Sequence, residues 1–215
     1  MHVHILSIFP TIVENYLNES IMKRAQEKWL LSYTLYNIAD WTVKHTRRVD
    51  DRPYGWWPGT ILMVEPLYNL LHHIEWEHGK QPILFFSPRW NRLTQQRIEI
   101  FAKEHDSYIL ICGHYEGVDE RIFSLFPIEE ISIGDFVISS GELALLVWID
   151  SVTRLLPWVI HEDSLREETF SEGIGRKKEY PQYTRPQTFR ELAVPDVLMR
   201  GDKEAIRQWN HTHTS

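Results

Sequence analysis

Three glycine-bearing segments of the chain could bind a small ligand through their backbone. They read SPRWNR at 87–92, CGHYEGVDER at 112–121 and SIGDFVISSGEL at 132–143. Each follows a predicted strand, and in an open parallel sheet ligands bind beyond the carboxyl ends of the strands. Glycine lets the backbone approach a ligand closely, so the amides and carbonyls here could bind the edge of an adenine. The residues alone leave ordinary turns as the alternative for these segments.

Carboxylates near these glycines indicate the charge of the expected ligand. Glu116, Asp119, Glu120 and Asp135 make the region acidic, which disfavours a phosphate and favours a cation. S-adenosylmethionine carries an adenine and a positive sulfonium but no phosphate. It therefore fits the predicted region better than a nucleotide does.

Two other groups of residues could in principle bind a metal or act in catalysis, but the sequence does not favour either role. The H-x-E formed by His73 and Glu75 is half of a zinc deaminase signature, but the other half needs two cysteines and Cys112 is the only one. We therefore predict a solvated helix face, and no metal site, for the cluster His72, His73, Glu75, Glu77 and His78. Cys112 and His114 could be a nucleophile and its base, but a small residue at the end of a buried strand is the favoured interpretation.

The elements that would position these segments follow from the apolar pattern. Short apolar stretches at 3–9, 31–38, 82–86 and 107–112 predict buried strands, and 94–104 predicts a helix that Thr94 can cap. A helix between successive strands implies βαβ units. We therefore predict an α/β domain with a largely parallel sheet over residues 1–160.

A further helix is predicted to begin near Gly141, with Ser139 and Glu142 as a capping box, and to end at Leu156 before Pro157. It is apolar around most of its girth, which indicates burial against a sheet or a second subunit. The charged stretch 161–183 is predicted to be a flexible linker. Residues 184–215 should form a short helical part, with helices at 195–200 and 202–209 separated by Gly201.

Composition excludes several classes of protein. The 215 residues are 43% hydrophobic and 25% charged, which suits a globular chain, and no apolar run approaches the ~20 residues of a membrane span. One cysteine and the lack of a basic start before the first apolar residues favour the cytoplasm. The net charge of -7 means that any nucleic acid must bind through local basic patches.

Five segments of the chain match one family in order from position 8 to Trp209. They are VDDRPYG, CGHYEGVDERI, EISIGDFVISSGELALLVWIDSVTRLLP, PQYTRP and VPDVLMRGDKEAIRQW. Together they resemble the bacterial tRNA (guanine-N1-)-methyltransferases, of the TrmD type within the SPOUT superfamily. The resemblance implies a knotted α/β fold, here with a shortened C-terminal helical part, and a homodimer with shared active sites. It also implies methyl transfer from S-adenosylmethionine to N1 of the guanosine at tRNA position 37, 3′ of the anticodon; Mg²⁺ is a candidate second cofactor.

The resemblance also assigns residues to roles. It implies that Arg154 is the catalytic arginine and that Glu168 stands where the family has its catalytic aspartate. The chemistry suits such a pair, because a carboxylate can remove the proton of guanine N1 while a guanidinium stabilises the charge that gathers on O6. Without the family, an ion pair with Asp150 would be the preferred role of Arg154. The implied cofactor-binding residues are Pro88, Gly113, Tyr115, Glu116, Gly117, Ile133, Gly134, Asp135, Phe136, Val137, Ile138, Ser140, Gly141 and Ala144.

Basic residues in two places are predicted to bind tRNA. The first group is Lys44, Arg47, Arg48 and Arg52, and the second is Arg176, Lys177, Lys178 and Arg185. A solvated run of charge is the alternative, and Asp50 and Asp51 partly cancel the first group.

Several residues depart from the family pattern. Trp56, Trp57, Trp90 and Ser140 stand at usual glycine positions, His114 replaces an arginine and Phe136 replaces a tyrosine. Bulky residues at glycine positions could narrow the pocket. The second hypothesis is therefore a non-catalytic or retargeted relative that binds RNA or S-adenosylmethionine.

Overall fold

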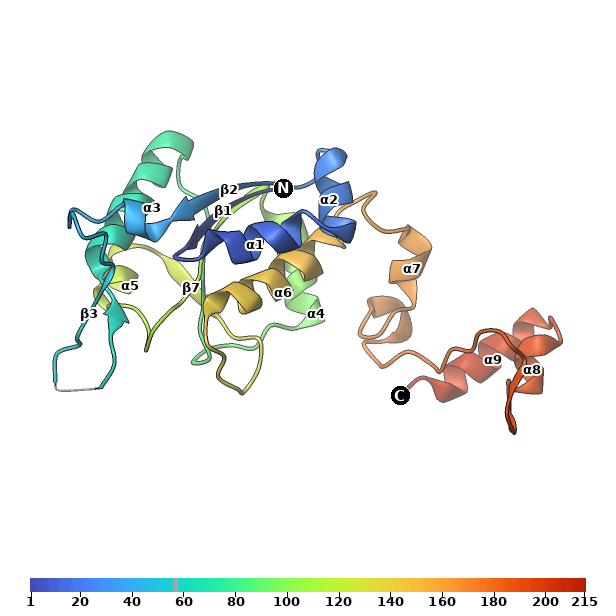
Figure 1. Ribbon diagram of the computed structural model, residues 1–215. Helices are drawn as coiled ribbons and strands as arrows, with labels where there is room; N and C mark the ends of the chain where they lie inside the picture. The colour runs from blue at the N-terminus through green and yellow to red at the C-terminus, as the bar shows by residue number, and fades with distance from the viewer. Residues whose placement is uncertain (56–57) are drawn as a thin grey trace. The chain divides into compact units, whose positions relative to one another are not determined.

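The computed structural model describes residues 1–55 and 58–215 (Figure 1). The chain divides into two compact units, Met1–Val159 and Ile160–Ser215. The first unit contains the large sheet and both hydrophobic cores. In the described part of the chain, no helix is long and apolar enough to cross a membrane.

Five parallel strands form the central sheet of the first unit. Their order is β2-β1-β6-β5-β7, and every neighbouring pair is parallel. This confirms the predicted α/β class, and four of the strands lie where the apolar pattern predicted them. The bounds are β1 (His2–Ser7), β2 (Ser32–Asn37), β5 (Ile83–Phe86), β6 (Ser107–Ile111) and β7 (Ile128–Ile131).

Alternate residues of the strands face two separate cores. In β5, Leu84 and Phe86 face one core, and Ile83 and Phe85 face the other. Burial of both faces explains why the strands read as continuous apolar runs. Four helices cover the first face: α1 (Pro10–Leu17), α2 (Ser20–Glu27), α4 (Gln95–Glu104) and α6 (Gly141–Thr153). The second is covered by α3 (Val64–His78), α5 (Arg121–Leu125) and η1 (Ile38–Asp40).

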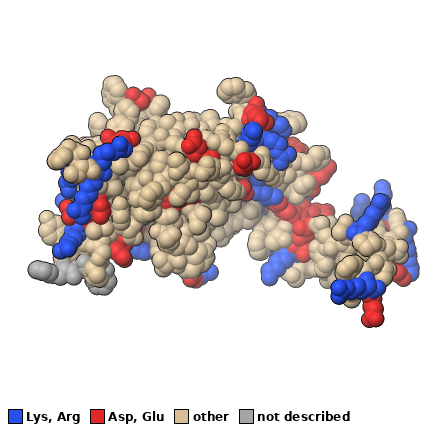
Figure 2. All heavy atoms as spheres, viewed as in Figure 1, with Lys and Arg blue, Asp and Glu red and all other residues tan. Residues whose placement is uncertain are grey.

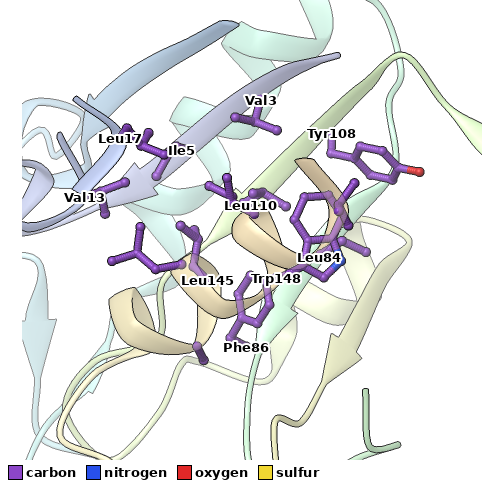
Figure 3. Close-up of a cluster of buried hydrophobic side chains, with 14 of the residues drawn as sticks. Val3, Ile5, Val13, Leu17, Leu84, Phe86, Tyr108, Leu110, Leu145 and Trp148 are labelled. Carbon is purple, nitrogen blue, oxygen red and sulfur yellow. The ribbon is translucent and has the colours of Figure 1, made fainter. Parts of the chain in front are cut away.

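The first core is centred on Trp148 of α6, whose side chain is fully buried among residues of α1, β1, β5 and β6 (Figure 3). Its ring meets those of Phe101 and Tyr108 edge-on, at centroid distances of 5.5 and 5.1 Å. The Tyr108 hydroxyl donates a hydrogen bond of 2.7 Å to the carbonyl of Phe101. These contacts hold α4 and α6 against β6.

The structure corrects one feature of α6 and confirms one of α4. Thr94 caps α4 as predicted, because its hydroxyl accepts a hydrogen bond from the backbone N–H of Arg97. The capping box predicted for α6 is wrong: Ser140 is the N-cap and makes no side-chain cap bond. Glu142 instead is fully buried and accepts a 2.5 Å hydrogen bond from the hydroxyl of Ser7. The helix ends at Thr153, before the predicted end at Leu156, and residues 154 and 155 continue as a turn.

A small hairpin adjoins the loop that follows β6. It consists of β3 (Asp50–Asp51) and β4 (Ile61–Leu62), which pair antiparallel. The backbone N–H of Leu62 donates to the carbonyl of Gly117 at 2.9 Å, and that of Glu116 donates to Thr60 at 3.0 Å. Trp56 and Trp57, two of the departures from the family pattern, lie between these strands and outside the described residues.

The second unit consists of short elements. They are α7 (Glu162–Arg166), η2 (Glu172–Ile174), β8 (Thr188–Phe189), β9 (Leu192–Ala193), α8 (Asp196–Met199) and α9 (Lys203–His213). The two predicted helical pieces are confirmed as α8 and α9, with Gly201 at a φ of +74° between them. The stretch predicted as a linker contains α7 and η2, so part of it has regular structure. Its flexibility stays a prediction.

Candidate active site

A cavity of about 290 Å³ lies in the first unit, where β5, β6 and β7 end. The carboxyl ends of these neighbouring parallel strands meet at one edge, so the three glycine-bearing segments come together there as predicted. Apart from Asp135, all the cofactor-binding residues implied by the family line this cavity: Pro88, Gly113, Tyr115, Glu116, Gly117, Ile133, Gly134, Phe136, Val137, Ile138, Ser140, Gly141 and Ala144.

Gly113 and Gly141 allow the backbones of their two segments to pack directly against each other at the cavity. The backbone N–H of Gly141 donates a 2.7 Å hydrogen bond to the carbonyl of Gly113. A Cβ at Gly141 would lie 2.4 Å from the backbone nitrogen of Gly113, and one at Gly113 would lie 3.1 Å from the carbonyl oxygen of Phe86. Side chains at these positions would therefore force the backbone apart. The resulting wall of bare backbone can approach a ligand closely.

Most of the carboxylates near the cavity are paired with arginines, so the region is less acidic than the sequence predicted. Of the four predicted to make the region acidic, only Glu116 lines the cavity. The others have arginine partners: Asp135 accepts from Arg92 Nε at 2.8 Å, Asp119 accepts from Arg121 Nε at 2.9 Å, and Glu120 lies 3.5 Å from Arg89 Nη2. The hydrogen bonds from Arg121 lower the pKa of Asp119 below its usual range. The predicted acidic lining therefore holds for Glu116 alone.

The predicted cofactor-binding residues did not include Arg89 and His114, which also lie at this site. Arg89 lines the cavity. The segment SPRWNR that contains it was predicted to lie at the site, but Arg89 itself was not predicted as a binding residue. His114 also lines the cavity, and its Nδ1 lies 3.7 Å from Oε2 of the buried Glu142. Proximity to a strand end could have indicated both side chains. Glu142 could not have been found, because a carboxylate in the first turn of a helix is normally read as a solvated cap.

The Cys112 thiol does not suit nucleophilic chemistry. It is fully buried, and burial followed by the charge of Glu142 raises its pKa well above the usual range. A thiol held protonated is a poor nucleophile. This supports the interpretation of Cys112 as a small residue at the end of a buried strand.

Trp90 does not fill the cavity. Its side chain is 59% exposed, and it is absent from the described residues that line the walls. Ser140 does line the cavity, but its small side chain is accommodated at the start of α6. Two of the departures from the family pattern therefore leave the cavity open.

The implied catalytic residues belong to different units. Arg154 follows α6 in the first unit, and its backbone N–H donates to the carbonyl of Asp150 at 3.0 Å. The carboxylate of Asp150 accepts a 2.6 Å hydrogen bond from Tyr16, which raises the pKa of the Tyr16 hydroxyl to about 12. Glu168 is a half-buried residue of the second unit, just after α7. The two residues to which the resemblance assigns catalytic roles therefore lie in different units.

Three residues of the first predicted tRNA-binding group lie close to carboxylates. Lys44 lies 3.5 Å from Asp51, Arg48 lies 3.4 Å from Asp50, and Arg47 pairs with Asp40. Figure 2 shows Lys and Arg side chains near β3 intermixed with acidic ones. In the second unit, Arg176 donates to the carbonyl of Phe170 at 3.0 Å, and Arg185 is exposed. Phosphate contacts here would have to compete with these ion pairs.

Comparison with known proteins identifies the family. The sequence model of the family described as tRNA (Guanine-1)-methyltransferase TrmD matches residues 1–215. The tRNA (guanine-N(1)-)-methyltransferase of Clostridioides difficile is 41% identical over 212 residues, which are 97% of this chain and 90% of that protein. That of Moorella thermoacetica is 44% identical over 97% of this chain and 83% of its own length.

A solved structure agrees with the sequence comparisons. The tRNA (m1G37) methyltransferase of Aquifex aeolicus superimposes with a TM-score of 0.81 and 33% identity, covering 99% of this chain and 88% of that one. A family match over the whole chain, together with these identities, shows that the protein belongs to the TrmD family of tRNA (guanine-N1-)-methyltransferases. Its fold is the knotted α/β fold of the SPOUT superfamily.

Proposed function

We propose that this chain transfers a methyl group from S-adenosylmethionine to N1 of the guanosine at position 37 of tRNA. The observation that carries this proposal is the cavity at the ends of β5, β6 and β7, which is lined by all but one of the residues predicted to bind the cofactor. Family membership over the whole chain supports the same reaction. No feature of the described residues favours the non-catalytic alternative, because Trp90 and Ser140 leave the cavity open.

The residues of the cavity fit this cofactor. The close crossing of Gly113 and Gly141 presents bare backbone, which suits the flat face and polar edge of an adenine. Ile133 and Ile138 supply apolar wall, and Glu116 supplies the carboxylate that a sulfonium favours. When bound, S-adenosylmethionine supplies an electrophilic methyl group. Titration calorimetry should detect its binding, and Gly113→Val should abolish it by pushing a side chain against Phe85 and Phe86.

Glu168 and Arg154 are proposed to activate the guanine. N1 carries a proton and is a weak nucleophile until that proton leaves, so the Glu168 carboxylate accepts it as general base. The electron pair then left on the ring is shared between N1 and O6, and the Arg154 guanidinium stabilises the negative charge on O6. Loss of 1-methylguanosine formation at position 37 when Glu168 or Arg154 is replaced, with S-adenosylmethionine binding retained, tests this assignment.

We also propose a homodimer with shared active sites, formed through α1 and α6. These helices lie side by side, joined by the hydrogen bond from Tyr16 to Asp150 (Figure 1). They expose large apolar side chains: Phe9, Ile12, Tyr16, Leu143 and Val147 are each 42–53% exposed. A second copy that covers this surface would remove them from water.

Light scattering at low micromolar concentration should therefore give about twice the chain mass of 25.7 kDa. The double variant Leu143→Glu/Val147→Glu places two charges on the proposed interface and should give monomers. The matched control is Leu125→Glu, which places a charge on an exposed leucine of α5, on the other side of the sheet. A wild-type monomer would contradict the proposed shared sites.

Binding of tRNA should depend strongly on salt, because phosphate contacts release counterions from the nucleic acid. The proposed contacts are Lys44, Arg47, Arg48 and Arg52 in the first unit and Arg185, with Arg176, Lys177 and Lys178, in the second. Neutralising either group should weaken binding and make the logarithmic salt slope less steep by about 0.9 for each phosphate that no longer has a basic partner. Lys80, which follows the C-cap of α3, is a suitable control for neutralisation. Salt-independent binding would refute this assignment.

The remaining assignments rest on the same proposal. A tRNA substrate and a single cysteine suit a cytoplasmic location. Mg²⁺ stays a candidate second cofactor; among the described residues, no group of three or more His, Cys, Asp or Glu side chains could hold a metal ion. Residues 1–160 would bind the cofactor, and 161–183 would connect them to the short C-terminal helical part at 184–215.

A further inference from the structure

His114 and Glu142 meet at the wall of the cavity, and each has a buried atom that lacks a hydrogen bond. The Glu142 side chain is 0% exposed, and its Oε2 has no hydrogen-bond partner. Nδ1 of His114 is likewise buried without a partner, and it lies 3.7 Å from that oxygen. Leaving both atoms unpaired would be costly. A neutral imidazole with its hydrogen on Nδ1 satisfies both after a small movement of the ring, because Nδ1 donates and the carboxylate oxygen accepts.

Neighbouring hydrogen bonds fix the direction of the donors around Glu142. The backbone N–H of Phe9 donates to Ser7 Oγ at 2.8 Å, and the Ser7 hydroxyl donates to Glu142 Oε1 at 2.5 Å. Glu142 is therefore an acceptor at Oε1, and a donor from His114 at Oε2 completes its pairing inside the protein. The charge of this carboxylate also acts on Cys112, where it adds to burial in raising the pKa of the thiol.

The tautomer with its hydrogen on Nδ1 leaves Nε2 of His114 as an acceptor. The residue lines the cavity, and its side chain is 17% exposed although Nδ1 is buried. Within residues 1–55 and 58–215, Nε2 makes no hydrogen bond and, unlike Nδ1, is not among the buried atoms. The ring lies between those of Phe9 and Tyr115, at centroid distances of 5.1 and 5.4 Å, which limits its rotation. Nε2 is therefore open to a ligand that donates a hydrogen bond.

We propose that His114 is a specificity-determining residue of the cofactor cavity: Glu142 holds it in the tautomer whose free Nε2 accepts a hydrogen bond from the ammonium group of the methyl donor. This inference deepens the proposed cofactor site and rests on it. His114 binds the ligand, and Glu142 acts through His114 as a positioning residue. The arrangement needs no change of charge, because the imidazole stays neutral and Glu142 stays a carboxylate throughout.

The charge of Glu142 favours the ammonium over the other donors of the ligand. S-adenosylmethionine has N–H and O–H donors on its adenine, on its ribose and on the α-ammonium group of its methionine part. A carboxylate behind an imidazole polarises the ring and strengthens Nε2 as an acceptor, most of all for a cationic donor. The bare backbone at Gly113 and Gly141 already suits the adenine. The ammonium is therefore the donor that gains most from a side-chain acceptor at this wall.

Two ligands and one variant test the acceptor on the full chain. S-adenosylhomocysteine carries the ammonium group, whereas 5′-methylthioadenosine lacks the whole amino-acid part. In His114→Asn the shorter side chain keeps an amide N–H for Glu142 but has no atom at the position of Nε2. Calorimetry at pH about 8, above the usual histidine pKa, should show S-adenosylhomocysteine bound about ten-fold or more weakly than by the wild type, and 5′-methylthioadenosine within about two-fold. His72→Asn, which removes an exposed histidine of α3, should bind both ligands like the wild type.

Glu142→Gln tests the positioning role. The glutamine carbonyl can accept from Ser7 while its amide donates to Nδ1 of His114, so the buried atoms stay paired and the imidazole hydrogen moves to Nε2. His114 then offers a donor where it offered an acceptor. S-adenosylhomocysteine should bind at least as weakly as to His114→Asn, with 5′-methylthioadenosine again unchanged. Nitrogen NMR should show the Nδ1–H tautomer of His114 in the wild type and the Nε2–H tautomer in Glu142→Gln, a change that a merely structural role of Glu142 would not produce.

Three results would overturn the inference while leaving the cofactor site intact: an Nε2–H tautomer in the wild type, an equal loss of affinity for both ligands in His114→Asn, or no loss for either. Tighter binding of S-adenosylhomocysteine by Glu142→Gln would also overturn it, because a donor at Nε2 favours the carboxylate of the ligand and not its ammonium. Failure of the wild type to bind either ligand would contradict the proposed cofactor site, and the inference with it.

Discussion

Replacing Glu168 with glutamine should lower the rate of tRNA methylation by about 100- to 10,000-fold, the usual contribution of a general base. Glutamine keeps the shape of the side chain but cannot accept the N1 proton. Because Glu168 belongs to the second unit and the cofactor cavity to the first, binding of S-adenosylmethionine should change little. Single-turnover methylation and calorimetry on the same preparations separate the two effects.

Two further variants make this prediction specific. Glu168→Asp keeps a carboxylate but draws it back by about 1 Å. It should lower activity if the loop already holds the longer side chain at the right distance, and raise activity if Glu168 is a tolerated substitute for the family's aspartate. Glu167→Gln is the matched control: the Glu167 carboxylate accepts a hydrogen bond from Tyr180 at 3.4 Å, and its loss should cost little. If Glu168→Gln methylated tRNA at the wild-type rate and Glu167→Gln lost most of the activity, Glu167 and not Glu168 would be the general base.

A single methyl group at Gly141 should disrupt both the fold and the cavity. The Cβ of Gly141→Ala would lie 2.4 Å from the Gly113 nitrogen and 3.0 Å from Cys112 backbone atoms, which cannot move aside as a flexible side chain would. We expect a loss of about 3 kcal/mol in the free energy of unfolding, at the upper end for overpacking. For a chain of this size that lowers the melting temperature by about 6–12 °C.

Ser151→Ala is the control on the same helix. Ser151 is a partly exposed residue whose hydroxyl only donates to the carbonyl of Val147, so the change should shift stability by less than about 0.5 kcal/mol. Gly141→Ala should also weaken S-adenosylmethionine binding, because the crossing of Gly141 and Gly113 forms part of the cavity wall. A Gly141→Ala protein with the wild-type melting temperature would show that this crossing can relax.

The sequence predicted the sheet and the location of the cavity because both follow from local patterns. Strands buried on both faces read as continuous apolar runs, as β5 and β6 do, and glycines after such strands mark the ligand edge. The pattern did not delimit β7, since its sequence IEEI carries two charged residues at the edge of the sheet. The knotted connection came from the family resemblance, because no local pattern encodes threading.

The charge of the site could not be predicted, because partners distant in sequence determine it. Asp135 pairs with Arg92, and Glu120 lies near Arg89. Of the four carboxylates expected to line the cavity, only Glu116 does so. Glu142 shows the reverse error. It has the spacing of a capping residue, yet Ser7, 135 positions away in sequence, hydrogen-bonds it inside the core.

Mapping of the methylated product is the decisive experiment for the proposed function. Purified protein, S-adenosylmethionine and an unmodified tRNA transcript with guanosine at position 37 should yield 1-methylguanosine at that position, identified by nuclease digestion and mass spectrometry. A transcript with adenosine at position 37 should gain no methyl group. Methylation of another atom or position, or none by a protein that binds both ligands, would contradict the proposed function and favour a retargeted or non-catalytic member of the family.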